Sequence, residues 1–264
     1  MIVDTRRLFL KLLRTFDIET VCDVGSMDGS DALRFRRTLP AADIVAFEPN
    51  PRNFALMEAD PRLQRNCVRV LPLAASDRDS HAPFFVVAAE YAAHRDLARR
   101  GMSSLHERSP TALIAEVAQV RTVRLDTVLV AEGRARQRIA LWIDTEGMAF
   151  EAISGASGVL DRTQVLHVEV ETVPCIGAQQ RLFPDVERIL LDSGFALLAT
   201  DHPRSAIQFN ALFVRAELLR AKTARIGWHL RNGQLHRHLK QTVRPLLPSR
   251  FRRFLSRHAN AVRI

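Results

Sequence analysis

Cysteines are few in this chain and long apolar runs are missing, and each shortage excludes a class of protein. The three cysteines, Cys22, Cys67 and Cys175, are widely spaced and form no Cys-x-x-Cys pair. Neither a disulfide framework nor a zinc site is therefore expected. We expect the protein to lie in a reducing cytoplasm. No apolar run approaches the roughly 18–20 residues of a membrane-spanning helix. Four basic residues interrupt the first 16 residues, so we expect an amphipathic helix there and not a secretory signal.

Acidic residues are nearly absent from the last part of the chain. From Arg215 to Ile264 there are 13 Lys and Arg side chains against one acid, Glu217, a net charge of +12. The whole chain carries +9, so the difference, −3, falls on the residues before Arg215. This shift in composition predicts three parts. They are an N-terminal helix over 1–17, a main domain over 18–215 and a basic extension over 216–264.

What is present is an alternation of strand-like and helix-like segments. The chain has 264 residues, of which 47% are hydrophobic, enough for one large α/β domain with appendages. Such alternation predicts a doubly wound, mostly parallel sheet with helices on both faces and ligands beyond the carboxyl ends of the strands. Strands are expected over 18–24, 44–47, 68–71, 120–125, 139–143, 165–170, 195–199 and 208–214. Helices are expected over 32–39, 54–63, 149–156 and 184–193.

The most informative stretch is a strand–turn–helix–strand unit built around two glycines. Gly25 and Gly29 are separated by three residues, and Glu48 ends the next strand, 23 residues after Gly25. No Gly-x-Gly-x-x-Gly triplet occurs in the chain, which argues against a dinucleotide pyrophosphate. S-adenosylmethionine has no phosphate and needs a wider turn, carboxyl groups near its ammonium and an acid for its ribose. Asp23, Asp28 and Glu48 supply these groups, and a plain strand-to-helix loop is the alternative.

Three more acids follow the ends of expected strands. Asp77 lies just past the third strand, where a carboxylate can receive the adenine amino group, and the alternative is an Asx turn before Arg78. Asp144 ends an otherwise apolar strand, so its carboxylate needs a partner or solvent unless it caps the following helix. Glu146 is either a site residue or an acid in the first turn of that helix.

A second set of polar side chains shares one face of the strand over 165–170. His167, Glu169 and Glu171 alternate with apolar residues, so a period of two puts them on the same side. Glu169 is nearest the middle of this set, and burying it without a role would be costly. His167 is as compatible with a satisfied core histidine as with a catalytic base.

Together these motifs show a resemblance to a known family. The chain resembles the FkbM family of S-adenosylmethionine-dependent methyltransferases from about Val21 to Arg215. The matching segments occur in family order and are Asp23–Gly29, Phe47–Pro51, Ala74–Asp77, Ser103–Leu105, Val123–Asp126, Ile143–Gly147, Val168–Glu171, Gly194–Phe195 and Phe213–Arg215. Any one of them is unspecific, whereas nine in register are specific. The resemblance implies a class I methyltransferase fold, S-adenosylmethionine as cofactor, and O-methylation of a hydroxyl on a sugar, glycan or polyketide-type molecule.

The predicted cofactor residues follow from these motifs and from the strand ends. They are Asp23, Gly25, Ser26, Asp28, Gly29, Glu48, Asn50, Ser76, Asp77 and Asp144. The family commonly has Ala and Asn where this chain has Ser26 and Met27, and acids where it has Ala149 and Asn210. Gln also occurs in the family at the place of Glu146. These departures leave a non-catalytic, cofactor-binding homologue as an alternative.

Methyl transfer to a hydroxyl is an in-line displacement, and aligning the two reactants gives most of its acceleration. An alkyl hydroxyl is a poor nucleophile at neutral pH, so a general base helps. Asp144 is the first candidate for this base, followed by His167 and Glu169. A divalent metal held by Asp144, Glu146 and Glu169 is another way to activate the hydroxyl, but the spacing is not diagnostic and no metal is predicted.

The polar segment from Tyr91 to Pro110 is expected to form a lid on the acceptor side. It lies outside the core strands, and Gly101 is a candidate hinge. An ordinary surface loop is the alternative. The predicted acceptor-binding residues are Ser103, Ser104, His106, Glu146 and Glu171.

The basic extension has apolar residues at helical spacing. Phe251, Phe254, Leu255 and His258 fall at i, i+3, i+4 and i+7 among arginines. Such a pattern is typical of helices on an anionic membrane surface, which predicts a cytoplasmic protein that contacts the inner face of the membrane. Packing on the core and oligomerisation are alternatives. RNA contact, as in a nucleic-acid methyltransferase, is a third, and the scarcity of aromatic residues, 6% of the chain, disfavours it.

Overall fold

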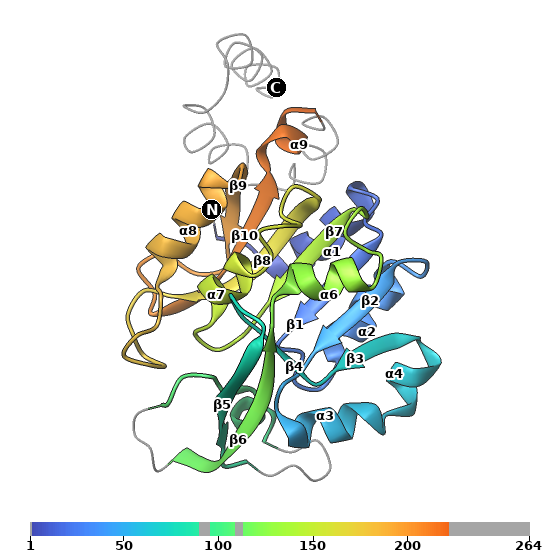
Figure 1. The fold of residues 1–264 in the computed structure, drawn as a ribbon. Helices are drawn as coiled ribbons and strands as arrows, with labels where there is room; N and C mark the ends of the chain where they lie inside the picture. Colours follow the sequence, from blue (N-terminus) through green and yellow to red (C-terminus); the bar gives the residue numbers. More distant parts are fainter. Residues whose placement is uncertain (1, 90–95, 109–112, 222–264) are drawn as a thin grey trace.

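The computed structural model describes residues 2–89, 96–108 and 113–221, whose arrangement is drawn in Figure 1. The strands are β1 (Thr20–Val24), β2 (Asp43–Phe47), β3 (Val68–Leu71), β4 (Leu73–Ala75), β5 (Ser80–Val87), β6 (Ile114–Val123), β7 (Ile139–Ile143), β8 (Thr163–Glu171), β9 (Phe195–Thr200) and β10 (Gln208–Arg215). The helices are α1 (Thr5–Thr15), α2 (Ser30–Thr38), α3 (Pro51–Glu58), α4 (Pro61–Arg65), α5 (Leu97–Gly101), α6 (Leu125–Ala131), α7 (Ala149–Ser154), α8 (Phe183–Asp192) and α9 (Ala216–Ala221). The amphipathic pattern of the basic extension and part of the expected lid, Tyr91 included, lie outside the described residues.

The central sheet has seven strands in the order β3-β2-β1-β7-β8-β10-β9. Neighbouring strands are parallel except at β10, which runs antiparallel to both β8 and β9. The strand order reverses between β1 and β7, because the chain builds outward from β1 to β3 and then returns to build the other half. This arrangement confirms the expected class I methyltransferase fold.

Helices cover both faces of the sheet, and each face has its own apolar core (Figure 1). The first core combines α1 and α2 with one side of the strands, and the second combines α6, α7 and α8 with the other side. In β8 the residues alternate between them, with Val165 in the first core and Leu166 and Val168 in the second. The same alternation turns His167 and Glu169 toward the side of the first core.

The N-terminal helix α1 packs into the first core, as its apolar stripe predicts. The side chain of Asp4 caps the helix by accepting a hydrogen bond of 2.8 Å from the backbone N–H of Arg7. Phe9 is completely buried, and its ring contacts the rings of Phe35 and Trp142 at centroid distances of 5.6 and 5.3 Å. The helix therefore belongs to the same packed body as the sheet.

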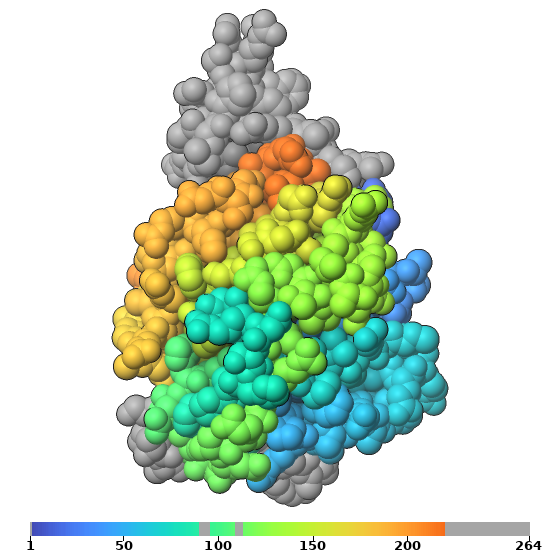
Figure 2. Space-filling view, in the orientation of Figure 1, coloured from blue at the N-terminus to red at the C-terminus, as the bar shows by residue number. Residues whose placement is uncertain are grey.

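A second, smaller sheet of order β4-β6-β5 was not predicted from the sequence. It forms because β6 is longer than the short strand expected over 120–125 and pairs antiparallel with β5 along its length. Figure 2 shows its surface continuous with that of α3 and α4. These two helices replace the single helix expected over 54–63, because Asp60 caps a new helix that begins at Pro61. Within the described ranges, no helix is both long and apolar enough to cross a bilayer.

Candidate active site

A cavity of about 300 Å³ lies at the carboxyl ends of β1, β2 and β7. It sits where the strand order reverses, the point at which a doubly wound sheet leaves a crevice for ligands. Its walls come from α1, α2, the glycine turn after β1, β4, α5 and the loop after β7. Segments that are far apart in the sequence therefore meet around one space, which we take as the candidate active site.

The turn after β1 brings the backbone close to the loop after β7. Gly25 has a φ of +84°, and a Cβ atom there would lie 1.8 Å from the carbonyl oxygen of Asp144. Only glycine permits this approach. Two residues later, Met27 has a φ of +55°, a left-handed backbone that non-glycine residues seldom adopt. The turn is thus closely packed at Gly25, and the packing around it holds Met27 in an unfavourable backbone conformation.

Asp23, at the end of β1, joins this turn to α2. Its carboxylate accepts hydrogen bonds from the Ser26 hydroxyl at 2.6 Å and from the backbone N–H of Ala32 at 3.1 Å. Burial and the nearby charge of Asp31 raise the pKa of Asp23 to about 8, against the effect of these two hydrogen bonds. Asp28 accepts bonds from the backbone N–H and hydroxyl of Ser30, both at 2.9 Å. Both predicted acids line the cavity.

Glu48 directly follows β2 and is hydrogen-bonded to the glycine turn at Met27. One of its oxygens accepts a hydrogen bond of 2.6 Å from the backbone N–H of Met27, and the other accepts bonds from Asn50 N–H at 2.9 Å and the Asn53 amide at 3.4 Å. Burial raises the pKa of Glu48 to about 7, although these bonds and the charge of Arg100 lower it. Because a carboxylate has about four acceptor positions, Glu48 can still receive hydroxyl donors from the cavity.

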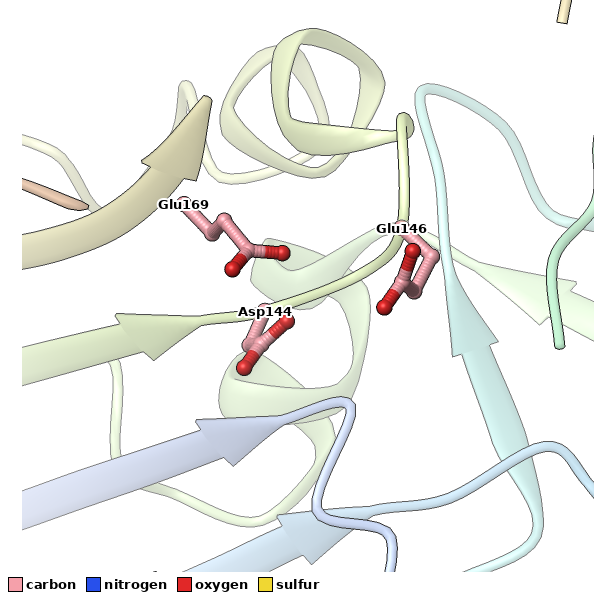
Figure 3. A group of neighbouring side chains, drawn as sticks. All are labelled: Asp144, Glu146 and Glu169. Carbon is pink, nitrogen blue, oxygen red and sulfur yellow. The ribbon is translucent and has the colours of Figure 1, made fainter. Parts of the chain in front are cut away.

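Asp144, Glu146 and Glu169 gather beyond the end of β7 (Figure 3). One oxygen of each lies within 4.8 Å of the others, close enough to hold a metal ion. Burial raises the pKa of Asp144, and a hydrogen bond with Glu169 works against this rise. Burial and the charges of Asp144 and Glu146 also raise the pKa of Glu169. Two buried carboxyl groups this close disfavour a second negative charge, so the pair favours holding one proton between them.

Glu146 forms an ion pair with Arg108 and has a left-handed backbone, with a φ of +49°. Burial and the neighbouring charge of Asp144 raise the pKa of Glu146 to about 7, while Arg108 lowers it. The hydroxyl of Ser104 donates a hydrogen bond of 2.6 Å to the carbonyl oxygen of Glu146. Arg108 and Ser104 belong to the predicted lid, so this segment is bonded directly to the loop that carries Asp144.

Residues 96–108, which we call the lid segment, form one wall of the cavity. Leu97, Arg100, Gly101, Ser103 and Leu105 line it. Arg100 is almost fully buried, at 1% exposure, and its Nε donates a hydrogen bond of 3.1 Å to the side chain of Asn53. The described part of the expected lid is therefore a packed wall of the site and not a loop that extends into solvent.

Several predicted cofactor residues do not line the cavity. Asp77 is paired with Arg78, and a hydrogen bond from Arg78 is the main cause of its lowered pKa. Ser76 is buried next to it and donates to its carboxylate at 3.2 Å. Asn50 and Gly29 contact residues next to the cavity. The backbone N–H of Asn50 donates a hydrogen bond to Glu48, and Gly29 is packed so closely on Leu63 that a Cβ atom would clash. The structure thus gives these four residues supporting positions.

His167 is placed away from the cavity, behind Trp142. Its ring stacks on the Trp142 ring with centroids 3.6 Å apart, and its Nε2 lies 3.0 Å from the hydroxyl of Thr5. Burial lowers the pKa of His167 to about 3. A side chain in this position fits the alternative of a core histidine, although its Nδ1 is buried without a hydrogen-bond partner, and we do not retain it as a candidate base.

The remaining predicted acceptor residues surround the loop after β7. Ser103 lines the cavity, and its hydroxyl accepts a bond of 3.1 Å from the backbone N–H of Val87. Glu171 is buried and accepts hydrogen bonds from Gln180 and Gln208 at 2.5 and 3.2 Å. His106 packs against Gly177, and burial lowers its pKa. Neither Glu171 nor His106 lines the cavity among the described residues.

Sequence reasoning missed the arginines of the site. Arg6 of α1, Arg34 of α2 and Arg100 of α5 all line the cavity, together with Trp142. Nothing in the local sequence distinguishes Arg6 from Arg7, or Arg100 from Arg99. Their roles depend on which way a long side chain extends once distant helices have packed.

Comparison with known proteins agrees with this arrangement. The methyltransferase FkbM domain matches residues 23–197, more than half of the chain. The 2-O-methyltransferase NoeI of Sinorhizobium fredii (strain NBRC 101917 / NGR234) is 30% identical over 154 residues, which are 56% of this chain and 62% of that protein. The chain therefore spans less than two thirds of the length of this relative.

Solved structures with a similar fold are more distant. A putative O-methyltransferase from Klebsiella pneumoniae is 10% identical, with a TM-score of 0.46 over 81% of each chain. The magnesium protoporphyrin IX methyltransferase of Synechocystis PCC 6803, solved with bound SAM, is 12% identical, with a TM-score of 0.42 over 80% of this chain and 78% of that one. The family match covers the glycine turn, the strand-end acids and the lid segment. The chain belongs to the FkbM family of S-adenosylmethionine-dependent methyltransferases.

Proposed function

We propose that this protein transfers a methyl group from S-adenosylmethionine to a hydroxyl of a sugar, a glycan or a similar small acceptor, with Asp144 as general base. The observation that carries the proposal is the position of Asp144, which lines the cavity with the carboxyl group of Glu169 next to its own. Oxygen as the acceptor atom is supported by the relative that is 30% identical, a 2-O-methyltransferase.

The side chains around the cavity fit the parts of S-adenosylmethionine. Glu48 has free acceptor positions for ribose hydroxyls, and Asp23 and Asp28 suit the ammonium of the methionine end. Ala75 and Phe84 give an apolar wall suited to the adenine ring. When bound, the cofactor supplies a methyl group on a positively charged sulfur, which becomes a neutral thioether on transfer.

Asp144 is the partner of the pair that lines the cavity. With the proton of the pair on Glu169, Asp144 can accept the proton that an acceptor hydroxyl loses as its oxygen is methylated. The raised pKa of Asp144 makes it a stronger base than an ordinary aspartate and better matched to neutral pH. The lid segment closes one side of this space, which helps to exclude water that would compete for the base.

A divalent cation at the same three carboxylates is the second mechanism to test. It would polarise the acceptor hydroxyl and displace the shared proton. The ion pair between Glu146 and Arg108 makes the cluster less anionic than three free carboxylates, and the raised pKa values of Asp144 and Glu169 favour a proton on that pair. We therefore propose the base mechanism and expect turnover to persist in EDTA. Loss of turnover that Mg²⁺ or Mn²⁺ restores would favour the metal mechanism.

The test is a methyl-transfer assay with a panel of acceptors. The full-length protein is incubated with S-adenosylmethionine and neutral hexoses, deoxyhexoses, uronic acids, short oligosaccharides or total tRNA. Formation of S-adenosylhomocysteine is measured, and mass spectrometry identifies the methylated product. We expect a methylated sugar or oligosaccharide with the wild-type protein and not with Asp144→Asn. Methylation of tRNA alone would overturn the acceptor class, and cofactor binding without transfer to any acceptor would favour a non-catalytic homologue.

A further inference from the structure

Arg6 is a cavity residue that neither the motifs nor the base mechanism uses. It lies in the first turn of α1, and its guanidinium stands over the ring of Trp142, 5.6 Å from the centroid. Its nearest carboxylate oxygen is on Asp31, at 3.7 Å, which is too long for a hydrogen bond. Among the described residues the Arg6 guanidinium makes no hydrogen bond, although half of the side chain is buried. Its donors are therefore available to a ligand.

The cavity is strongly acidic, so the position of each arginine matters. The acids that line it are Asp23, Asp28, Asp31, Glu48, Asp144 and Glu146. An anionic group of a ligand would be repelled everywhere except beside an arginine. Arg100 is the arginine at the end of the cavity near Glu48. Its side chain donates a hydrogen bond to Asn53, and Asn53 donates one to Glu48. At the other end, near Asp144, the cations that line the cavity are Arg6 and Arg34.

Arg34 is already engaged by the protein. It donates a hydrogen bond of 2.6 Å to Asp31, three residues earlier on the same helix. Arg6 forms a looser ion pair with the same carboxylate from α1, at 3.7 Å. The charges of Arg6 and Asp31 also act in opposite directions on the pKa of Asp144, which places both near the base. Arg6 is thus the less engaged of the two cations, and its guanidinium can turn to receive an anion at this end.

We propose that Arg6, with Arg34 beside it, forms a carboxylate-binding subsite at the Asp144 end of the cavity. The subsite deepens the proposed function and rests on it. If Glu48 binds the ribose, the methionine end of the cofactor lies toward the glycine turn and Asp144, and its carboxylate reaches the Arg6 guanidinium. The planar guanidinium suits a carboxylate because two parallel N–H groups can bind its two oxygens. The ring of Trp142 supports the guanidinium, which lies over it.

The same chemistry has a second source, because an acidic acceptor such as a uronic acid would also place a carboxylate near Asp144. The experiment therefore compares ligands with and without a carboxylate from each source. S-adenosylhomocysteine carries the amino-acid carboxylate, and 5′-methylthioadenosine lacks the whole amino-acid end. The affinity of each is measured by calorimetry for the full-length wild type, Arg6→Gln, Arg6→Lys and Arg7→Gln. Arg7 is the matched control because it lies next to Arg6 and is exposed outside the cavity.

We expect Arg6→Gln to weaken S-adenosylhomocysteine binding roughly tenfold to a hundredfold, the effect of one charge-assisted contact. Binding of 5′-methylthioadenosine should stay within a few-fold, which also shows that the variant is folded. Arg6→Lys should retain part of the affinity, and Arg7→Gln all of it. The acceptor arm repeats the titration with D-glucuronate and D-glucose on protein saturated with S-adenosylhomocysteine.

Loss of glucuronate binding in Arg6→Gln, with S-adenosylhomocysteine affinity unchanged, would assign the subsite to the acceptor. Unchanged binding of both carboxylate ligands would overturn the subsite. An equal loss of S-adenosylhomocysteine and 5′-methylthioadenosine would overturn it as well, because the carboxylate would then play no part. A wild-type protein that binds neither nucleoside would contradict the proposed function itself, and the subsite would fall with it.

Discussion

At the scale of single residues, Asp144 and Glu169 act as a unit because their carboxyl groups are neighbours and the ionisation of one raises the pKa of the other. Asp144→Asn removes the carboxylate that lines the cavity and keeps the shape of the side chain. We expect kcat to fall roughly 100-fold or more, the usual contribution of a positioned base, while S-adenosylhomocysteine affinity stays within a few-fold. The wild-type rate should rise with pH through the raised pKa of Asp144, and that rise should be absent in the variant.

Glu169 provides the matched control for this prediction. Because Glu169 does not line the cavity and Glu169→Gln keeps a donor toward Asp144, this change should cost much less than Asp144→Asn. Steady-state kinetics of both variants, measured over a range of pH, shows which of the two residues is the base. If Glu169→Gln is the more damaging change, the two roles are exchanged and Glu169 is the base.

Glu48 gives a second prediction at this scale, since its pKa of about 7 makes cofactor binding depend on pH. Ribose hydroxyls donate to the ionised carboxylate, so binding should lower this pKa and release protons near neutrality. Affinity for S-adenosylhomocysteine should therefore increase between about pH 6 and pH 8. Glu48→Gln should remove most of this dependence, and Glu48→Ala should cost about 1.5–3 kcal/mol of binding free energy.

Calorimetry in buffers of different ionisation enthalpy measures the proton release directly. Glu58→Gln is a suitable control, because Glu58 is exposed on α3. A Glu48→Gln variant with unchanged affinity and unchanged proton release would show that Glu48 only supports the glycine turn through Met27.

At the scale of elements, the lid segment and the loop after β7 are joined by the ion pair of Arg108 and Glu146. Arg108→Gln leaves a half-buried carboxylate without its cation next to Asp144. We expect the free energy of unfolding to fall by about 1–3 kcal/mol, measured by urea denaturation. The double variant Arg108→Gln with Glu146→Gln should recover most of the loss, because no unpaired charge remains. Additive losses would show that the pair does not couple the two segments. Arg99→Gln, on the exposed side of α5, is the control.

The sequence alone located the elements whose patterns are local. The period of two in β8 and the acids after β1, β2 and β7 lead to the positions of Asp23, Glu48 and Asp144. A period of two predicts which face of the sheet a side chain is on, but it does not predict how far along the strand, from the core to the cavity, that side chain lies. His167 therefore has the same pattern as Glu169 and lies two residues further into the core.

Other features depend on contacts that no local pattern encodes. Asp77 follows the third strand as expected, but the adjacent Arg78 forms an ion pair with it outside the cavity. The substitution of Met27 for the family's Asn was visible in the sequence. Its left-handed backbone was not, and Asn is the residue that tolerates that conformation. The pairing of β5 with β6 joins residues that are separated by the lid segment, so the smaller sheet could not be predicted from either strand alone.

At the scale of the whole molecule, buried acids around the cavity make stability depend on pH. Burial raises the pKa of Asp23 to about 8 and those of Glu48 and Glu146 to about 7. Between their ordinary values near 4 and these raised values, the folded protein binds more protons than the unfolded chain. The free energy of unfolding of the ligand-free protein should therefore fall as pH rises from about 5 to 8. Urea denaturation at several pH values measures this slope, and Asp23→Asn should make it shallower. A stability that rises with pH over this range would contradict the raised pKa values.

The basic extension gives a prediction that rests on its charge. Residues 216–264 carry a net charge of +11, which exceeds the +9 of the whole chain. Each Lys or Arg near an anionic surface contributes up to about 1 kcal/mol, so full-length protein should sediment with anionic liposomes. About 0.5 M salt should release it, because screening then shortens the reach of exposed charges to a few ångströms.

A variant truncated after Ala221, the last residue of α9, is the control for the liposome experiment. It should bind S-adenosylhomocysteine as the full chain does and should no longer sediment. Loss of cofactor binding on truncation would assign the extension to the core or to an oligomer interface, and the membrane prediction would fail.

The position of α1 has a practical consequence for recombinant work on this protein. The family match begins at residue 23, so a fragment cut at that boundary would lack α1. It would lose Arg6 from the cavity wall and leave the rings of Phe35 and Trp142 without Phe9. Such a fragment should aggregate or bind cofactor poorly even though every family motif is present. Likewise, chimaeras that exchange glycine turns between family members should carry α1 along, and an affinity tag is better placed away from the helix that holds Arg6.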